Sequence, residues 1–252
     1  MTMRFLPAHA PAVAAAVAML ALPGAATAVA AAPTPAKPCV LLVHDIARDA
    51  SSWDTARDLL ERRGRCAITV TWGAPTGAEV PVPTAGLRGA DAGVNDLADA
   101  IADAGGGPFD IVAHGAGALV AQRYLQRFGP SSVRSLTTLG PLWHGTEIGG
   151  LAATEEVSRT LGTYDLVLAW EKPLVDPVCA GCRELISGSD LLRAMHRDGA
   201  PTPGVRYTDI ASPCDELAPP TGLPGAHVVV LDRCVSHFAL ADDAGALGHA
   251  FS

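Results

Sequence analysis

The segment from Phe109 to Arg127 constrains the fold more than any other part of the chain. It begins as an apolar run typical of a buried strand, turns sharply through small residues at 113–117, and continues as a helical pattern. Strand and helix patterns alternate along the rest of the chain, which predicts an α/β fold with a mostly parallel central sheet and helices on both faces. The expected strands lie at 39–43, 67–72, 109–113, 133–139, 205–210 and 227–231, and the expected helices at 52–62, 94–101, 118–127 and 238–251.

The first 28 residues have the composition of a secretory signal peptide. Arg4 gives a positive start, residues 12–22 are apolar, and Ala26-Thr27-Ala28 is a small-residue cleavage site. The apolar run is too short for a stable membrane span and is broken by Pro23 and Gly24. We therefore expect a signal peptide over 1–28, a flexible leader over 29–37, a folded domain over 38–252, and a secreted protein, either extracellular or in the cell envelope.

The charge balance excludes one class of partner. The chain carries 26 acidic and 18 basic residues, a net charge of −8, and has no basic cluster of the kind that binds phosphates, so nucleic acid is not an expected partner. With 49% apolar and 17% charged residues, the composition is that of a globular protein.

Six cysteines fit an exported protein, because disulfides persist in oxidising compartments. Cys39 and Cys66 begin two strand runs, and neighbouring parallel strands could bring them together. The other four can pair as Cys179–Cys182 and Cys214–Cys234 or cross-link the two groups, and the sequence leaves these alternatives open.

The alternation loosens between Pro141 and about Arg197, a stretch that contains Trp143, Trp170 and the Cys179-x-x-Cys182 pair. One interpretation is a cap-like insertion over a binding cleft. The other is an irregular excursion that only packs against the domain. The sequence does not decide between them.

The turn at 113–117 matches a nucleophile elbow, the strand–turn–helix frame whose usual signature is Gly-x-Ser-x-Gly. Here the five residues are Ala113, His114, Gly115, Ala116 and Gly117. The final glycine fits, but the serine position holds Gly115, which has no nucleophilic atom. The alanines cannot replace it, and the nearest serines, at 131 and 132, lie beyond the helix.

The other two members of a serine–acid–histidine triad have candidates in the expected chain order. Asp215 follows the strand at 205–210, with Glu216 as a competitor for the role of acid. His237 lies six residues beyond the end of the last strand. No set of His, Cys and carboxylate residues has the spacing of a metal site, so we expect neither metal nor cofactor.

The oxyanion hole of such a site uses two backbone N–H groups. The residue after the nucleophile position is Ala116, and the loop after the first strand places a second donor near Ile46. In that loop His44 is expected to bond the backbone, as is His114 in the elbow. Asp45 brings a negative side chain to a place meant to stabilise an oxyanion, and it should oppose acyl transfer.

The chain from about Pro38 to its end resembles the secreted bacterial triacylglycerol lipases of the α/β-hydrolase fold. The resemblance rests on Leu42-Val43-His44-Asp45, where the family has Val-His-Gly, on His114-Gly115-Ala116-Gly117, and on further landmarks that keep the same order. It implies that Gly115 holds the nucleophile position, that Asp215 is the acid and His237 the base, and that Ile46 and Ala116 donate the oxyanion N–H groups. The further landmarks are the Trp53 helix, Arg123-Tyr124-Leu125, Leu139 to Thr146, Cys182 to Leu192 and Tyr207 to Leu217.

Three functional hypotheses follow. The first is a secreted lipase-like protein of the kind that hydrolyses carboxylic esters of lipids, inactivated by Gly115, that keeps acyl or lipid binding. The second is an active esterase or lipase that uses a displaced serine or a water activated by His237 and Asp215. The third is a secreted binding or structural domain without catalysis. The expected ligand is a lipid or a small ester, and no protein partner can be read from the sequence.

Overall fold

The computed structural model describes residues 38–75, 85–147 and 151–252. The signal peptide and leader expected from the sequence lie outside these residues. No helix within the described ranges combines the length and the apolar composition that crossing a bilayer requires.

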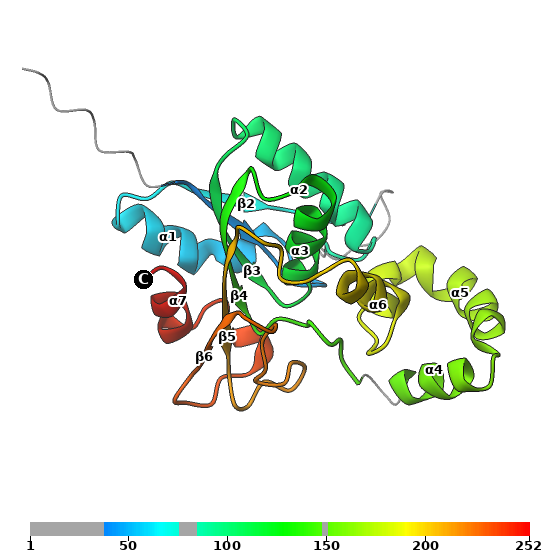
Figure 1. Cartoon of the computed structure of the whole chain (residues 1–252). Coiled ribbons are helices and arrows are strands. Elements are labelled where there is room, and N and C mark those ends of the chain that lie inside the picture. The colour runs from blue at the N-terminus through cyan, green and yellow to red at the C-terminus, as the bar shows by residue number, and fades with distance from the viewer. Residues whose placement is uncertain (1–37, 76–84, 148–150) are drawn as a thin grey trace, which may run out of the picture. The chain divides into compact units, whose positions relative to one another are not determined.

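Six strands in the described residues form one sheet in the order β2-β1-β3-β4-β5-β6 (Figure 1). Every neighbouring pair is parallel, as the alternation predicted. β1 pairs with β2 on one side and β3 on the other, and all four of its residues are buried, which explains its unbroken apolar sequence. The strands are β1 (Val40–Val43), β2 (Ala67–Val70), β3 (Phe109–His114), β4 (Val133–Leu139), β5 (Arg206–Ala211) and β6 (His227–Val230).

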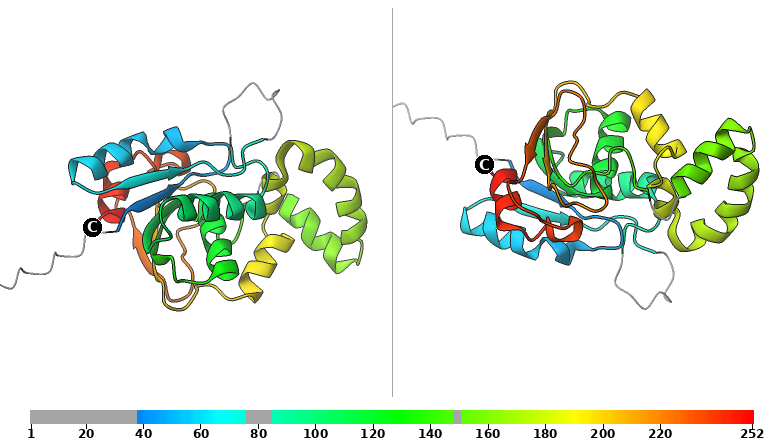
Figure 2. Two further views of the ribbon diagram at one scale, coloured as in Figure 1. Left: turned by 90° about the horizontal axis from the view of Figure 1, so that it is seen from above. Right: turned by 90° about the horizontal axis from the view of Figure 1, so that it is seen from below.

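Helices cover both faces of the sheet (Figure 2). α1 (Asp54–Arg62), which follows the short 3₁₀ helix η1 (Ala50–Trp53), lies with α7 (Ala244–Ala250) on one face. α2 (Ala90–Asp103) and α3 (Ala116–Phe128) cover the other.

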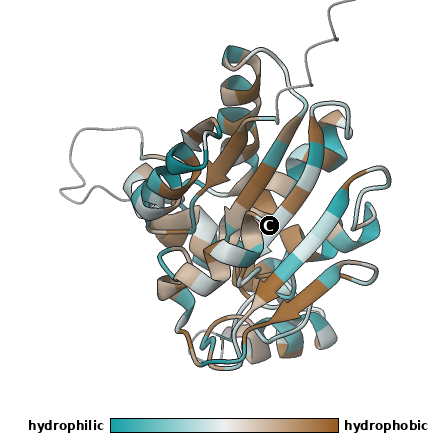
Figure 3. Cartoon of the chain, turned by 90° about the vertical axis from the view of Figure 1, so that its left-hand side faces the viewer, coloured by the Kyte–Doolittle hydropathy of each residue, from teal (hydrophilic) through white to brown (hydrophobic). Residues whose placement is uncertain are grey.

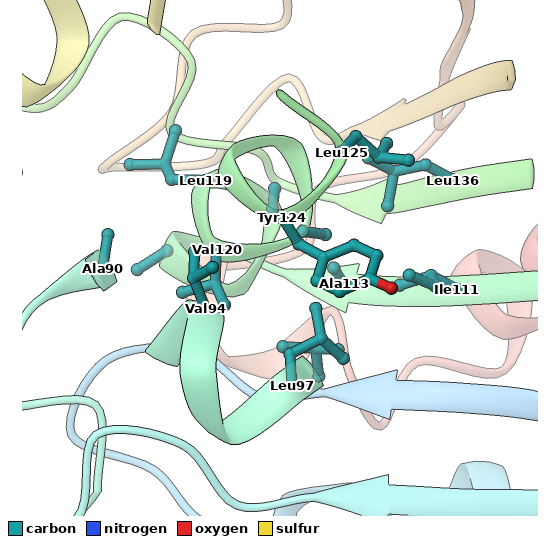
Figure 4. Packing of buried hydrophobic residues seen from close by; sticks show 14 of the residues in the cluster. Ala90, Val94, Leu97, Ile111, Ala113, Leu119, Val120, Tyr124, Leu125 and Leu136 are labelled. Atoms are coloured by element: carbon teal, nitrogen blue, oxygen red, sulfur yellow. The ribbon is translucent and has the colours of Figure 1, made fainter. Parts of the chain in front are cut away.

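Alternate residues of each central strand enter two separate cores, because side chains alternate across a strand. Leu41 of β1 joins the core beneath α2 and α3, whereas its neighbour Leu42 joins the core beneath α1 and α7. Figure 4 shows the first core, where Leu97 of α2 and Tyr124 of α3 meet Ile111 of β3. Figure 3 shows the hydrophobic stretches along the strands that supply both cores.

The stretch from 141 to 197 is largely helical in its described part. α4 (Leu151–Thr160), α5 (Tyr164–Glu184) and α6 (Asp190–Arg197) follow β4, and α4 and α5 lie to one side of the sheet layers (Figures 1 and 2). The sequence pattern did not predict these helices. The pattern is hard to read because α5 contains Pro173 and Pro177 and leaves non-helical backbone angles at Cys179. Its role as a cap stays a prediction.

Two helix ends differ from expectation. The helix expected from residue 52 is preceded by η1, which begins at Ala50 and is capped by the carboxylate of Asp49, the acceptor of the Ser51 N–H. The helix expected at 238–251 is split into the 3₁₀ turn η3 (His237–Ala239) and α7, because Asp243 caps a new helix by accepting the Ala246 N–H.

Three disulfides are present, and they use all six cysteines. Cys39–Cys66 joins the starts of β1 and β2, and Cys179–Cys182 lies within α5. Cys214–Cys234 links the loop after β5 to the loop after β6. Among the pairings that the sequence left open, the structure therefore has the one without cross-links between the two groups.

Candidate functional site

The candidate site lies at the carboxyl ends of β1 and β3. From β1 the chain runs to β2 on one side, and β3 pairs on the opposite side of β1. The loop after β1 leads to α1 on one face of the sheet and the loop after β3 leads to α3 on the other. Such a switch point opens a crevice where ligand sites of parallel sheets form.

The turn between β3 and α3 has the strained backbone of an elbow. Gly115 has φ 51° and ψ −118°, in a region that side chains other than glycine rarely occupy. Gly117 is needed for a different reason, since a Cβ there would lie 2.5 Å from the His44 carbonyl oxygen and 2.7 Å from that of Val43. α3 can therefore begin directly against the end of β1.

Asp215 and His237 are brought together by the loops after β5 and β6. The Nδ1 atom of His237 lies 2.9 Å from each carboxylate oxygen of Asp215. The Leu217 and Ala218 N–H groups donate to the same carboxylate and fix its orientation. Glu216, the competing acid, accepts the backbone N–H of His237 at 3.0 Å and not the ring proton.

Asp45 makes the contact that sequence reasoning missed. Its Oδ1 accepts the Ala116 N–H at 2.6 Å, and its Oδ2 lies 3.1 Å from Nε2 of His237. The side chains of Asp45 and His237 are fully buried. His237 is thus held between two carboxylates, Asp45 and Asp215, and the expected oxyanion donor Ala116 is already bonded to a resident anion.

The two carboxylates determine the charge of the imidazole. Burial by itself would lower the pKa of His237, but the hydrogen bonds to Asp215 and Asp45 outweigh it and raise the pKa to about 9. Burial by itself would raise the pKa of Asp45, but its hydrogen bond to His237 and the charge of that imidazolium bring the pKa of Asp45 below its usual value. At neutral pH the site is a carboxylate–imidazolium–carboxylate chain.

His44 and His114 bond backbone, as expected. His44 contacts the Asp45 carbonyl oxygen through Nδ1 at 2.7 Å and accepts the Trp72 N–H through Nε2. Nε2 of His114 donates to the His237 carbonyl oxygen at 2.9 Å. Burial lowers the pKa of both rings, so both stay neutral and hold the two loops in place.

One group in the described part of the chain has the composition of a metal site. Asp45, His114 and His237 each offer an atom within 4.8 Å of the others. The 3.1 Å contact between Asp45 and His237 has hydrogen-bond length, and the remaining nitrogen of His237 bonds Asp215. We therefore describe the group as an ion-paired network and assign no metal to it.

A cavity of about 610 Å³ borders the acid side of the site. Its lining includes Asp215, Glu216, His144 and Thr146, but not Asp45 or His237.

Asp209, buried on β5, anchors this region by accepting hydrogen bonds from the Thr138 hydroxyl, from the Trp143 indole and from the Leu223 N–H. No local sequence signal marks Asp209, because its three partners lie 14 to 71 residues away along the chain. For Ile46, the role of second oxyanion donor stays a prediction.

No protein-family model matches the chain, and no curated protein matches it. Solved structures do match. The lipase BlEst2 of Bacillus licheniformis in mature form is similar with a TM-score of 0.59 and 16% identity, over 83% of this chain and 89% of that one. A bromoperoxidase from Bacillus anthracis gives 0.58 and 15%, over 85% and 90%. The monoacylglycerol lipase of Paleococcus ferrophilus gives 0.54 and 15%, over 80% and 88%.

The chain has the α/β-hydrolase fold. The expectation drawn from the order of its motifs is confirmed at this level, and the similarity to bacterial lipases and esterases is one of fold at low identity. Fold similarity alone does not establish activity.

Proposed function

We propose that the chain is a lipase-like α/β-hydrolase of the secreted triacylglycerol lipase type that does not hydrolyse esters. The observation that carries the proposal is Gly115, which has the backbone of a nucleophile elbow and no nucleophilic atom. Asp45 supports it, because its carboxylate takes the bond of the Ala116 N–H that an oxyanion would need.

The charge of His237 argues against the alternative of an activated water. A general base must be unprotonated at the working pH. With its pKa raised to about 9 by Asp215 and Asp45, His237 already carries its proton at neutral pH. Its Nε2 atom, which would face a serine or a water, contacts Asp45. Because Nε2 of His237 is occupied by Asp45, His237 is also unsuited to activate a serine displaced from position 115.

Retained binding of acyl chains is the second part of the proposal. Large apolar side chains of α4 and α5 are exposed, with Trp170 at 73% and Leu174 at 72%. A surface of this kind suits an apolar ligand better than water. The third hypothesis, a purely structural domain, predicts no acyl affinity. The three disulfides favour an oxidising location, in keeping with the proposed secretion.

The test compares purified wild-type protein with its His237→Ala variant on p-nitrophenyl esters of short and medium acyl chains, together with a serine-directed fluorophosphonate probe. We expect no labelling and no turnover that depends on His237. Wild-type turnover that disappears in His237→Ala would refute the loss of catalysis. Displacement of a fluorescent fatty acid by unlabelled acyl chains tests the binding part, and an absence of binding would favour the structural domain.

A further inference from the structure

The space beside Gly115 is filled by one side chain. A Cβ atom built on Gly115 would lie 2.1 Å from Oδ1 of Asp45, 2.3 Å from its Cγ and 2.7 Å from its Oδ2. These distances are far below ordinary van der Waals contact, and they involve the whole carboxyl group of Asp45. Any residue other than glycine at position 115 must therefore displace that carboxyl group.

The carboxyl group of Asp45 is not free to move aside. Oδ1 is bonded to the Ala116 N–H at 2.6 Å and Oδ2 contacts Nε2 of His237 at 3.1 Å, in a fully buried setting. The aspartate side chain is short, so moving it away from position 115 breaks both contacts. The displaced charge would then be buried without its partners, which is strongly destabilising.

The two oxygens of Asp45 hold the two places that acyl transfer uses. The N–H of the residue after the nucleophile binds the developing oxyanion, and here it is bonded to Oδ1. The Nε2 atom of the triad histidine takes the proton of the serine hydroxyl, and here it faces Oδ2.

We propose that Asp45 and Gly115 are a matched pair, in which the Asp45 carboxylate fills the oxyanion and nucleophile positions together and glycine at 115 is what leaves room for it. This inference rests on the proposed function, because it takes the Ala116 N–H as the oxyanion donor and His237 as the base that Asp45 blocks. It goes further in one respect. The Gly115→Ser substitution alone does not give hydrolysis, because the carboxylate of Asp45 must be removed as well.

A double-mutant cycle tests the pair, with wild type, Gly115→Ser, Asp45→Gly and the double variant compared by thermal unfolding. In the presence of Asp45, the Gly115→Ser substitution should lower the midpoint by about 10 °C or more, from the broken buried contacts and the strained backbone together. In the Asp45→Gly background the same substitution should cost about half as much, because only the strain at positive φ remains. Equal losses in both backgrounds would overturn the pairing.

Activity supplies the second readout of the cycle. The double variant should hydrolyse p-nitrophenyl esters at least about a hundredfold faster than Gly115→Ser, since it frees one oxyanion donor and the base. Fluorophosphonate should label it at position 115, and adding His237→Ala should remove both signals. A folded double variant that is neither labelled nor active, or a Gly115→Ser variant as active as the double, would overturn the claim that Asp45 is the block.

Formate binding to Asp45→Gly keeps the proposal testable if the serine variants do not fold. Removing the carboxylate leaves a space between the Ala116 N–H and His237 Nε2 that a formate ion matches in shape and charge. Formate at about 100 mM should raise the midpoint of Asp45→Gly by a few degrees and leave wild type unchanged, with chloride at equal ionic strength as control. An equal response in both proteins would contradict the assignment. Hydrolysis by the wild type would refute the proposed function and leave this stability comparison unaffected.

Discussion

His237 is the residue whose surroundings depart most from those of a working hydrolase. A triad histidine has one carboxylate at Nδ1 and a nucleophile at Nε2. Here Asp215 lies at Nδ1 and Asp45 at Nε2. The second carboxylate makes the imidazolium the stable form and changes a group that could transfer a proton into one that holds three loops together.

The pH dependence of stability tests this charge state. The pKa of His237 is raised from 6.5 to about 9 in the folded protein, so the folded state binds the extra proton between these values. The stabilisation is complete below pH 6.5 and is lost as pH rises through about 9, by about 3 kcal/mol in total. His44 and His114, whose pKa values are lowered, affect stability only below pH 6.5. The midpoint of thermal unfolding should therefore fall between pH 6.5 and 9.

Asp45→Asn is the matched control for this pH profile. It keeps the size of the side chain and removes one of the two charges that raise the pKa of His237. The decline between pH 6.5 and 9 should shrink in this variant. A wild-type midpoint that stays level or rises over the same range would show that His237 is not protonated in the folded protein.

At the scale of elements, the disulfides restrain segments of very different length. Cys39–Cys66 spans 27 residues and joins β1 to β2, whereas Cys179–Cys182 spans three residues within α5. A longer closed loop removes more entropy from the unfolded chain. The first disulfide therefore restrains the whole β1–α1–β2 unit, and the second restrains one helical turn.

Removing these disulfides one at a time should show the difference. Replacing Cys39 and Cys66 by alanine should lower the free energy of unfolding by about 3 to 4 kcal/mol, and replacing Cys179 and Cys182 by about 2 kcal/mol or less. Urea unfolding of the two double variants beside wild type measures both values. The test is which double variant loses more free energy of unfolding. A larger loss on replacing Cys179 and Cys182 than on replacing Cys39 and Cys66 would contradict the prediction.

At the scale of the molecule, the apolar surface is unevenly distributed. Large apolar side chains are exposed on α4, just after it and on α5, and those on α5 recur every four residues, which places them on one face of the helix. Six of the ten exposed large apolar side chains in the described part of the chain lie between residues 157 and 178, and such clustering is typical of a binding surface. The exposed apolar residues on α4, just after it and on α5 are Val157, Leu161, Leu166, Trp170, Leu174 and Val178.

Trp170→Glu should change this surface without changing the fold. Because Trp170 is 73% exposed, its replacement should alter the free energy of unfolding by no more than about 0.5 kcal/mol. Binding of a hydrophobic fluorescent dye to the native protein should fall clearly. Val230→Glu, at an exposed apolar residue of β6, serves as control and should leave dye binding near the wild-type level. Equal dye binding by all three proteins would contradict a role for α5.

The sequence by itself determined the parallel sheet, the three helices that connect its first four strands and the position of the elbow. These follow from local pattern, because the strand at 109–114 is a short, mostly apolar run that is buried along its whole length, and α2 buries Val94, Leu97 and Ile101 on one face. The missing hydroxyl at Gly115 was also readable. The helices at 151–197 were not, because much of their apolar surface faces solvent and two prolines interrupt α5.

Only the tertiary structure decided what occupies the place of the missing hydroxyl. The sequence marked Asp45 as unfavourable for an oxyanion, but its partners Ala116 and His237 lie 71 and 192 residues farther along the chain. Contacts over such separations depend on how strand ends meet at the edge of the sheet, and local pattern carries no information about them. The sequence therefore showed which atom is absent, and the fold determined which side chain fills the space.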